Sequence, residues 1–155
     1  RLVLSMMPRL ESRGCFSSAR EANAEVATSF VSNVVTCIAH GNLTGPNGEK
    51  GAAYGISSRV DAVAFSLAGS CEEDARLVLP VIALPTDRVE IAGNRVRIIR
   101  ESAVVTVESD LSFELARTDR GDRAFSPIGG FLYAYLTAPV RAGRAFAVRV
   151  CVETL

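Results

Sequence analysis

The chain has 155 residues, enough for one domain with a substantial hydrophobic core. Its hydrophobic content of 48% and charged content of 22% are ordinary for a folded protein and exclude extensive disorder. The 17 basic and 17 acidic side chains balance, so no net positive field indicates a nucleic-acid partner. No uninterrupted apolar run reaches the length of about 18 residues that a membrane-spanning helix needs.

The first 28 residues differ from the rest, because they are rich in Arg and Ser and show little alternation. Ser18 and Glu21 have the spacing of a capping box, which predicts a short helix over Ala19–Thr28. We therefore expect residues 1–28 to form an amino-terminal arm or short helix, and residues 29–155 to form the main domain. Since the chain begins with Arg1, we expect a processed product, a fragment, or a sequence that lacks its true start.

Strand signals dominate the main domain. The β-branched run Phe30–Ala39 predicts a buried strand, and Gly41–Gly51 predicts a long exposed loop. Alternation over Val63–Leu67 predicts a half-buried strand. The apolar run Arg76–Leu84 contains Pro80, which favours an edge or bulged strand.

The clearest hairpin signal is Gly93-Asn94, which lies between two alternating segments, Val89–Ile91 and Arg95–Ile98. Ala103–Val107 and Leu111–Leu115 predict two more strands or one bulged strand.

The last segments, Phe131–Thr137 and Arg144–Thr154, flank a turn and predict a terminal hairpin that closes the sheet. In the final strand, alternate residues from Phe146 to Val152 are apolar, whereas Arg149 and its alternate neighbours would face water. Together the segments predict an all-β antiparallel β-sandwich, a jelly roll with about eight strands.

Two groups of residues are candidate contact sites. Arg95, Arg97 and Arg100 lie on or beside one strand and suit phosphate groups or a partner's carboxylates, although charge on an edge strand also keeps a protein soluble. Arg120-Gly121-Asp122, in the predicted charged loop Thr118–Ser126, suits a receptor-binding loop, and such a tripeptide also occurs by chance.

No catalytic, cofactor or metal site is predicted. The single histidine, His40, is interpreted as structural, and Glu72-Glu73-Asp74 as a solvated loop with a calcium site as the alternative. The four cysteines are too far apart in sequence for a zinc motif, and their disulfide state stays open. These residues are Cys15, Cys37, Cys71 and Cys151. Asn42-Leu-Thr44 is a glycosylation sequon, which matters only in a secretory compartment.

Residues 131–155 carry a family resemblance. The apolar strand Leu132–Leu136, the turn Thr137-Ala-Pro139 and the Val-rich strand Phe146–Val152 resemble the end of jelly-roll coat proteins of small icosahedral plant RNA viruses, such as the bromovirus and tymovirus groups. The resemblance implies a capsid subunit in a virion that assembles with copies of itself, without enzymatic activity. It also implies that the amino-terminal arm lies inside the shell, near genomic nucleic acid.

Alternatives remain beside the capsid hypothesis. The first is an extracellular β-sandwich adhesion or receptor-binding module that uses the Arg120-Gly121-Asp122 loop and a glycan on Asn42. A β-sandwich hydrolase and an accessory subunit of an organellar complex follow, the latter because of the amino-terminal Arg and Ser bias.

Overall fold

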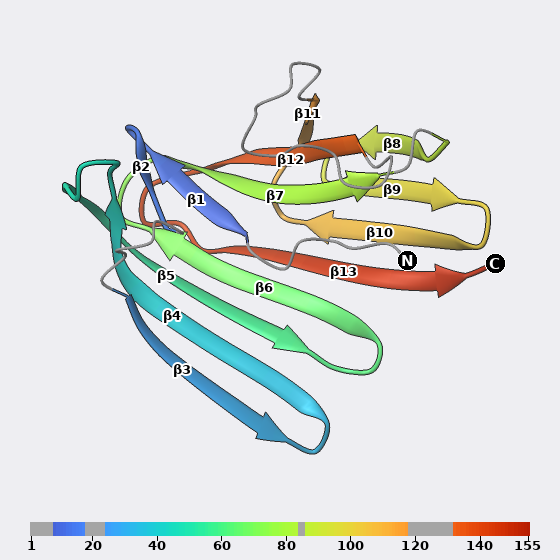
Figure 1. Cartoon of the computed structure of the whole chain (residues 1–155), viewed down its shortest axis with the longest axis horizontal. Helices are drawn as coiled ribbons and strands as arrows, with labels where there is room; N and C mark the ends of the chain where they lie inside the picture. The colour runs from blue at the N-terminus through green and yellow to red at the C-terminus, as the bar shows by residue number, and fades with distance from the viewer. Residues whose placement is uncertain (1–7, 18–23, 84–85, 118–131) are drawn as a thin grey trace.

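The computed structural model describes residues 8–17, 24–83, 86–117 and 132–155. The described residues form an all-β fold in which every strand pairing is antiparallel and no helix occurs (Figure 1). The strands are β1 (Arg9–Ser12), β2 (Cys15–Phe16), β3 (Ala24–Val31), β4 (Val34–Thr44), β5 (Lys50–Val60), β6 (Ala64–Cys71), β7 (Ala75–Ala83), β8 (Arg88–Ala92), β9 (Arg95–Arg100), β10 (Ala103–Ser109), β11 (Glu114–Arg117), β12 (Leu132–Val140) and β13 (Phe146–Thr154).

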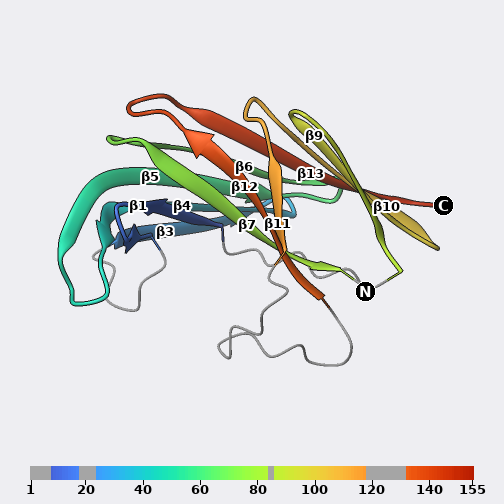
Figure 2. The ribbon, with the colours of Figure 1, turned by 90° about the horizontal axis from the view of Figure 1, so that it is seen from above.

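These strands form a single hydrogen-bonded sheet of 13 strands rather than an eight-strand jelly roll. The order is β11-β12-β7-β1-β2-β4-β5-β6-β13-β10-β9-β8, and β3 pairs with β4 beside this path. The sheet curls so that β1, β7 and β12 lie across from β6, β13 and β10, as the two views show (Figure 2). The all-β antiparallel prediction is therefore confirmed, whereas the strand number and jelly-roll order are corrected.

The core lies between these two parts of the curled sheet. Leu10, Leu77 and Leu136 come from the β1–β7–β12 part, and each is fully buried. They belong to one apolar cluster with Val107 of β10 and Phe146 of β13. The strands opposite therefore have one face turned to the core and one face turned outward.

The final strand follows the predicted alternation. Phe146, Val148 and Val150 are buried, whereas Ala147 and Arg149 are exposed. β13 does not form a hairpin with β12, however, because β12 pairs with β7 and β11 while β13 pairs with β6 and β10. The segment between them crosses from one part of the sheet to the other, and the amide of Gly143 donates a hydrogen bond to the carbonyl of Cys71 at 2.8 Å.

The amino-terminal helix is not observed where the chain is described. Residues 24–28 belong to β3, and Arg9–Ser12 pairs with β7 inside the sheet. β3 also runs through the expected boundary at residues 28 and 29. The capping-box residues Ser18 and Glu21 lie outside the described residues, whereas Ala24–Val31 pairs along its whole length with β4.

The predicted strand Phe30–Ala39 is in fact a hairpin between β3 and β4. Ser32 and Asn33 form its turn, with φ of 50° and 63°. Positive φ at both central residues suits the twist of a tight hairpin, and Asn tolerates it better than most residues. The predicted loop Gly41–Gly51 is shorter than expected, because β4 continues to Thr44.

The β8–β9 hairpin is confirmed, with Ala92 opposite Arg95 across the Gly93-Asn94 turn. Pro80 lies inside β7, beyond Arg76–Val78, the stretch that pairs with β1. At that point one side of β7 is free of β1, which is where a strand tolerates the missing N–H of proline.

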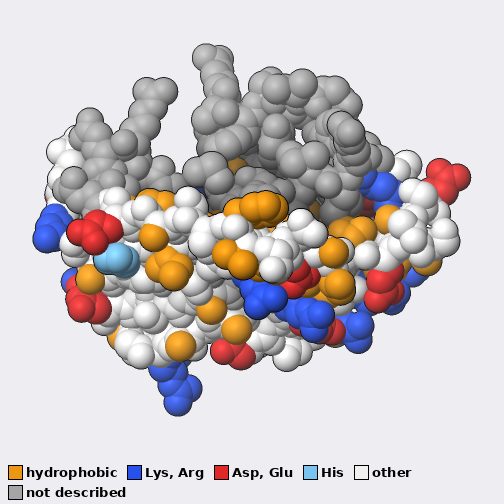
Figure 3. Space-filling model, turned by 90° about the horizontal axis from the view of Figure 1, so that it is seen from below, with side chains coloured by type: hydrophobic (Ala, Val, Ile, Leu, Met, Phe, Trp, Pro, Cys, Tyr) orange, Lys and Arg blue, Asp and Glu red, His pale blue; other side chains and the backbone are white. Residues whose placement is uncertain are grey.

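The β3–β4 hairpin reaches past the core. Phe30 and Val26 of β3 are 70% and 61% exposed, although both lie on the core face of the sheet by register. On the side of the molecule seen from below, hydrophobic side chains reach the surface among charged and other residues (Figure 3).

Among the described residues, no helix is long and apolar enough to cross a membrane.

Candidate functional site

One hollow of the described structure is a trough on the outer face of the sheet, opposite the core. It crosses β4, β5, β6, β13, β10 and β9 and has a volume of about 800 Å³. The polar side chains that line it are Thr36, Ser57, Ser58, Arg59, Ser66, Asn94, Arg95, Glu108, Ser109, Asp110 and Arg149. This volume lies within the range of small-ligand sites, and the open shape suits an extended ligand.

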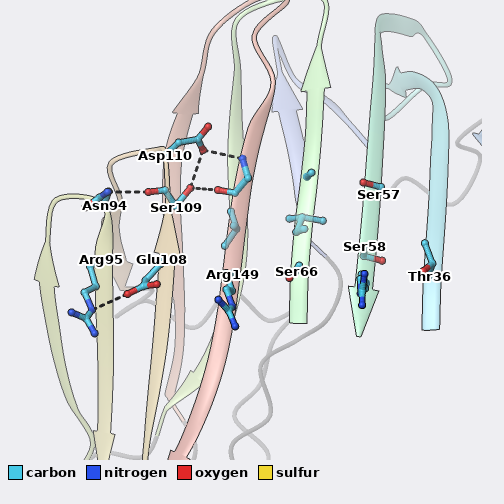
Figure 4. Close-up of a pocket in the computed structure, with 15 residues that line it drawn as sticks. Thr36, Ser57, Ser58, Ser66, Asn94, Arg95, Glu108, Ser109, Asp110 and Arg149 are labelled. Carbon is cyan, nitrogen blue, oxygen red and sulfur yellow. Dashed lines mark hydrogen bonds and ion pairs between the residues drawn. The ribbon is translucent and has the colours of Figure 1, made fainter. Parts of the chain in front are cut away.

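One row of side chains crosses the trough at right angles to the strands. Thr36 lies opposite Arg59, Arg59 opposite Ser66, and Ser66 opposite Arg149. The row continues from Arg149 to Glu108 and from Glu108 to Arg95. Figure 4 shows Ser66, Arg149, Glu108 and Arg95 side by side on neighbouring strands. Such in-register positions share one face, so their side chains line one continuous path.

Two of the arginines have acidic neighbours within the protein. Arg95 Nε lies 3.3 Å from Glu108 Oε1, and Arg59 Nε lies 3.7 Å from Asp61 Oδ2. Arg149 lies at the middle of the row, and no carboxylate in the described part of the chain lies within ion-pair distance of it. Because the arginine side chains of both pairs are more than half exposed, water screens these ion pairs strongly.

A hydrogen-bond network fixes one end of the trough. The Asn94 side-chain amide donates to the Ser109 carbonyl at 3.0 Å, and Ser109 Oγ donates to the Ala147 carbonyl at 2.6 Å. The Ala147 amide in turn donates to Asp110 Oδ1 at 2.9 Å. The turn before β9, the end of β10 and the start of β13 are thus held together (Figure 4). These hydrogen bonds fix the relative positions of the backbone segments at this end of the trough.

The turn between β5 and β6 follows Arg59, which lines the trough, and is held by its own hydrogen bonds. Asp61 Oδ1 accepts hydrogen bonds from the amides of Val63 and Ala64, each at 2.9 Å. These two backbone bonds lower the pKa of Asp61, with smaller contributions from the positive charges of Arg59 and Arg149. An aspartate side chain that bonds the backbone two residues on is a common turn device.

The structure separates the three arginines predicted as one site. Arg95 lines the trough, and Arg97 lies on the same face, where it pairs with Glu90 at 3.2 Å. Arg100 lies on the opposite face of β9 and forms a bidentate pair with Asp87, at 2.9 and 2.6 Å. The hydrogen bond to Asp87 raises the pKa of Arg100. The Arg100 guanidinium is thus bound by Asp87, and contact of the three arginines with phosphate or a partner stays a prediction.

Other candidates from the sequence take ordinary structural places. His40 lies on the exposed part of β4 and pairs with Glu25 at 3.0 Å. Asp74 accepts a hydrogen bond from the Ala142 amide at 2.8 Å, and Glu73 pairs with Arg13 at 3.4 Å. Within the described residues, no three acidic, histidine or cysteine side chains gather as metal ligands.

Asn42 lies in β4 rather than in a loop, and its side-chain amide donates to the Gly51 carbonyl at 3.1 Å. All four cysteines are free; Cys15 and Cys71 are buried in the core, whereas Cys37 and Cys151 are half-buried. The Arg120-Gly121-Asp122 tripeptide lies outside the described residues and stays a prediction.

Sequence reasoning missed the trough as a site. The exposed position of Arg149 on the last strand was predicted, but nothing local connects it with Arg59 or Ser66. Those residues meet only because β13 inserts between β6 and β10. The sequence signal for this site is an arginine at an outward position of a strand. It identifies the row only when the register of β13 with β6 and β10 is known.

Comparison with solved structures finds a similar fold. The chain is similar to a putative aldose 1-epimerase from Escherichia coli K12, with a TM-score of 0.54 and 9% sequence identity. The similarity covers 84% of this chain and 69% of that chain, and at this identity it shows the fold alone. Comparison with curated protein sequences finds no relative.

The family model for the ulvan lyase C-terminal domain matches residues 3–153. This match overturns the resemblance to plant-virus coat proteins, and with it the capsid function and the virion location. That resemblance rested on the hydrophobic alternation of residues 131–155, which any antiparallel sheet shares. The prediction that the chain is not an enzyme is also contradicted, because the matching family model describes the C-terminal domain of a lyase. The chain belongs to the ulvan lyase C-terminal domain family.

Proposed function

We propose that this chain is the polysaccharide-binding domain of a carbohydrate-processing enzyme, and that its outer trough holds an acidic saccharide chain. The family match supports the carbohydrate assignment, because its description names a domain of a lyase that acts on ulvan, a polysaccharide. An extracellular location goes with this proposal, since polymeric saccharides are processed before uptake. Self-association of the chain remains a prediction.

The lining of the trough favours hydrogen bonding over stacking. Hydroxyl groups come from Thr36, Ser57 and Ser66, and these suit the donors and acceptors of sugar rings. No aromatic side chain is among the described residues that line the trough. Without an aromatic platform, the strongest available contacts are charge-assisted hydrogen bonds from guanidinium groups to carboxylate or sulfate oxygens.

The observation that carries the proposal is the position of Arg149. Its side chain is exposed at the middle of the row and has no carboxylate within ion-pair distance in the described part of the chain. A planar guanidinium in this state presents free donors to a bidentate acceptor. Arg149 is thus the expected anchor for an acidic group.

The test compares binding of an acidic and a neutral polysaccharide, polygalacturonate and dextran, by affinity gel electrophoresis. We expect retardation by the acidic polymer only, and weaker binding as ionic strength rises. Arg149→Gln should weaken binding by roughly tenfold, the loss of one charge-assisted contact. Arg144→Gln is the matched control, because Arg144 is exposed in the segment before β13 and does not line the trough. Equal binding of dextran, or equal effects of the two variants, would refute the proposal.

A further inference from the structure

The strand β3 forms a free edge of the sheet in the described part of the chain. Its register with β4 is continuous from end to end, and no described strand pairs with its other side (Figure 1). In a two-residue hairpin the residues that flank the turn form a hydrogen-bonded pair, here Val31 and Val34. Bonded and non-bonded pairs alternate, so the backbone amides and carbonyls of Val26, Thr28 and Phe30 point away from β4.

This edge lacks the usual protection against pairing with another chain. β3 contains neither lysine, arginine nor proline, and Glu25 is its one charged residue. The strands at the two ends of the sheet order differ, because β8 carries the exposed charges of Arg88 and Glu90 and β11 begins with Glu114. Charged residues, proline and bulges keep edge strands from pairing, and a long edge without them is a template for another strand.

The side chains of β3 are complementary to a second copy of the same strand. In an antiparallel pair centred on Thr28, Val26 of each copy lies opposite Phe30 of the other, and Thr28 lies opposite its own counterpart. All three residues are exposed in the single chain, and they share the face that continues the core. Cross-strand pairs of an aromatic with a β-branched residue, or of two threonines, stabilise a sheet.

Backbone geometry and charge fit the same register. Opposite residues of an antiparallel pair share one hydrogen-bonding direction, and these three residues all direct their backbone groups away from β4. Glu25 of each copy then lies opposite Val31 of the other, so the two glutamates lie at opposite ends of the paired strands and do not repel each other. Centring the pair on Ala27 instead would lose both contacts between Val26 and Phe30.

We propose that β3 is a dimerisation edge, and that two copies of this chain pair through it antiparallel, around a two-fold axis at Thr28. The interface is isologous, because each copy contributes the same strand. About six backbone hydrogen bonds cross it and join the two sheets into one. An interface of one strand from each copy belongs to the smallest class, so the dimer dissociates on dilution. This inference is independent of the ligand proposed for the trough.

Sedimentation velocity of the whole chain at rising protein concentrations measures the association. We expect a reversible equilibrium between monomer and dimer. Phe30→Lys should raise the dissociation constant by about tenfold or more, because each dimer contains two of the pairs that it removes. Val63→Lys is the matched control, since Val63 is 69% exposed against 70% for Phe30 but lies in the turn between β5 and β6.

Cysteine substitution tests the register. Thr28→Cys places two thiols at directly opposed positions, whose Cα atoms about 5.5 Å apart allow a disulfide. We expect this variant to form a covalent dimer under mild oxidation. Ser29→Cys is the control, because Ser29 of each copy would face Ala27 of the other and the two thiols would lie too far apart. The parent chain, with its four free cysteines, gives the baseline.

The two measurements decide the proposal together. A dimer that Phe30→Lys weakens more than Val63→Lys, and that cross-links through Thr28→Cys more than through Ser29→Cys, supports it. A parent chain that stays monomeric at every concentration would overturn it, as would equal effects of the two lysine variants. Equal cross-linking of the two cysteine variants would also overturn the pairing at Thr28.

Discussion

The ion pair between Arg100 and Asp87 should stabilise the β8–β9 end of the sheet far more than any surface pair. The Arg100 side chain is 11% exposed and that of Asp87 is 1% exposed, and two hydrogen bonds of 2.9 and 2.6 Å join them. Removing one partner leaves the charge of the other largely buried and without the ion pair. Such a change costs about 3 kcal/mol or more, because the remaining charge stays largely shielded from water and has lost this opposite charge.

A double-mutant cycle isolates the pair, which matters because Asp87 has other interactions as well. The variants are Asp87→Ala, Arg100→Met and the double variant, with urea unfolding at neutral pH as the assay. We expect a coupling energy of about 2 kcal/mol, since the double variant leaves no buried charge.

The pair formed by Arg97 and Glu90 provides the matched control. Its 3.2 Å distance is comparable, but its side chains are 44% and 41% exposed. Its coupling energy should stay below about 1 kcal/mol. The argument from burial is wrong if the two cycles give equal coupling energies.

Two further predictions concern single residues. A Cβ on Gly69 would lie 2.7 Å from the Gly55 carbonyl oxygen and 2.9 Å from the Phe146 ring, so Gly69→Ala should lower the free energy of unfolding by about 1 to 3 kcal/mol. Gly55→Ala is the control in the same urea assay, because a Cβ there meets nothing within 4 Å, and an equal loss in both variants contradicts the packing argument. Asp61 has a pKa below its ordinary 3.8, so it contributes stability above that pH and loses it as the pH falls through the folded-state value. In Asp61→Asn, the free energy of unfolding should therefore fall less steeply below about pH 4 than in the parent chain. Equal falls in the two proteins, measured by unfolding at a series of pH values, would contradict the lowered pKa of Asp61.

The sequence predicted the class of fold because strand alternation is a local property. Phe146, Val148 and Val150 alternate with outward residues, and the Gly93-Asn94 turn has its own conformational signature. Such signals depend on neighbours within a few residues, and the structure confirms them. The missed Ser32-Asn33 turn has a weaker signature, since it contains no glycine.

The candidate site could not be predicted in the same way. Arg59 and Arg149 are 90 positions apart in sequence, and their places in one row depend on β13 pairing with β6. Strand partners are chosen by burial across the whole core, and a shift of one residue would turn Arg149 inward. The prediction of a terminal hairpin was wrong for the same reason. The strands β12 and β13 bury their apolar faces in different parts of the sheet.

The sequence by itself determined that this chain is an antiparallel β protein, since alternation, turn residues and composition act locally. Only the tertiary structure decided the order of the strands, the pairing of Arg100 with Asp87, and the row of Arg59, Arg149 and Arg95 across the trough. The physical reason is that register and strand order minimise the exposed apolar surface of the whole domain, a quantity that no short segment carries.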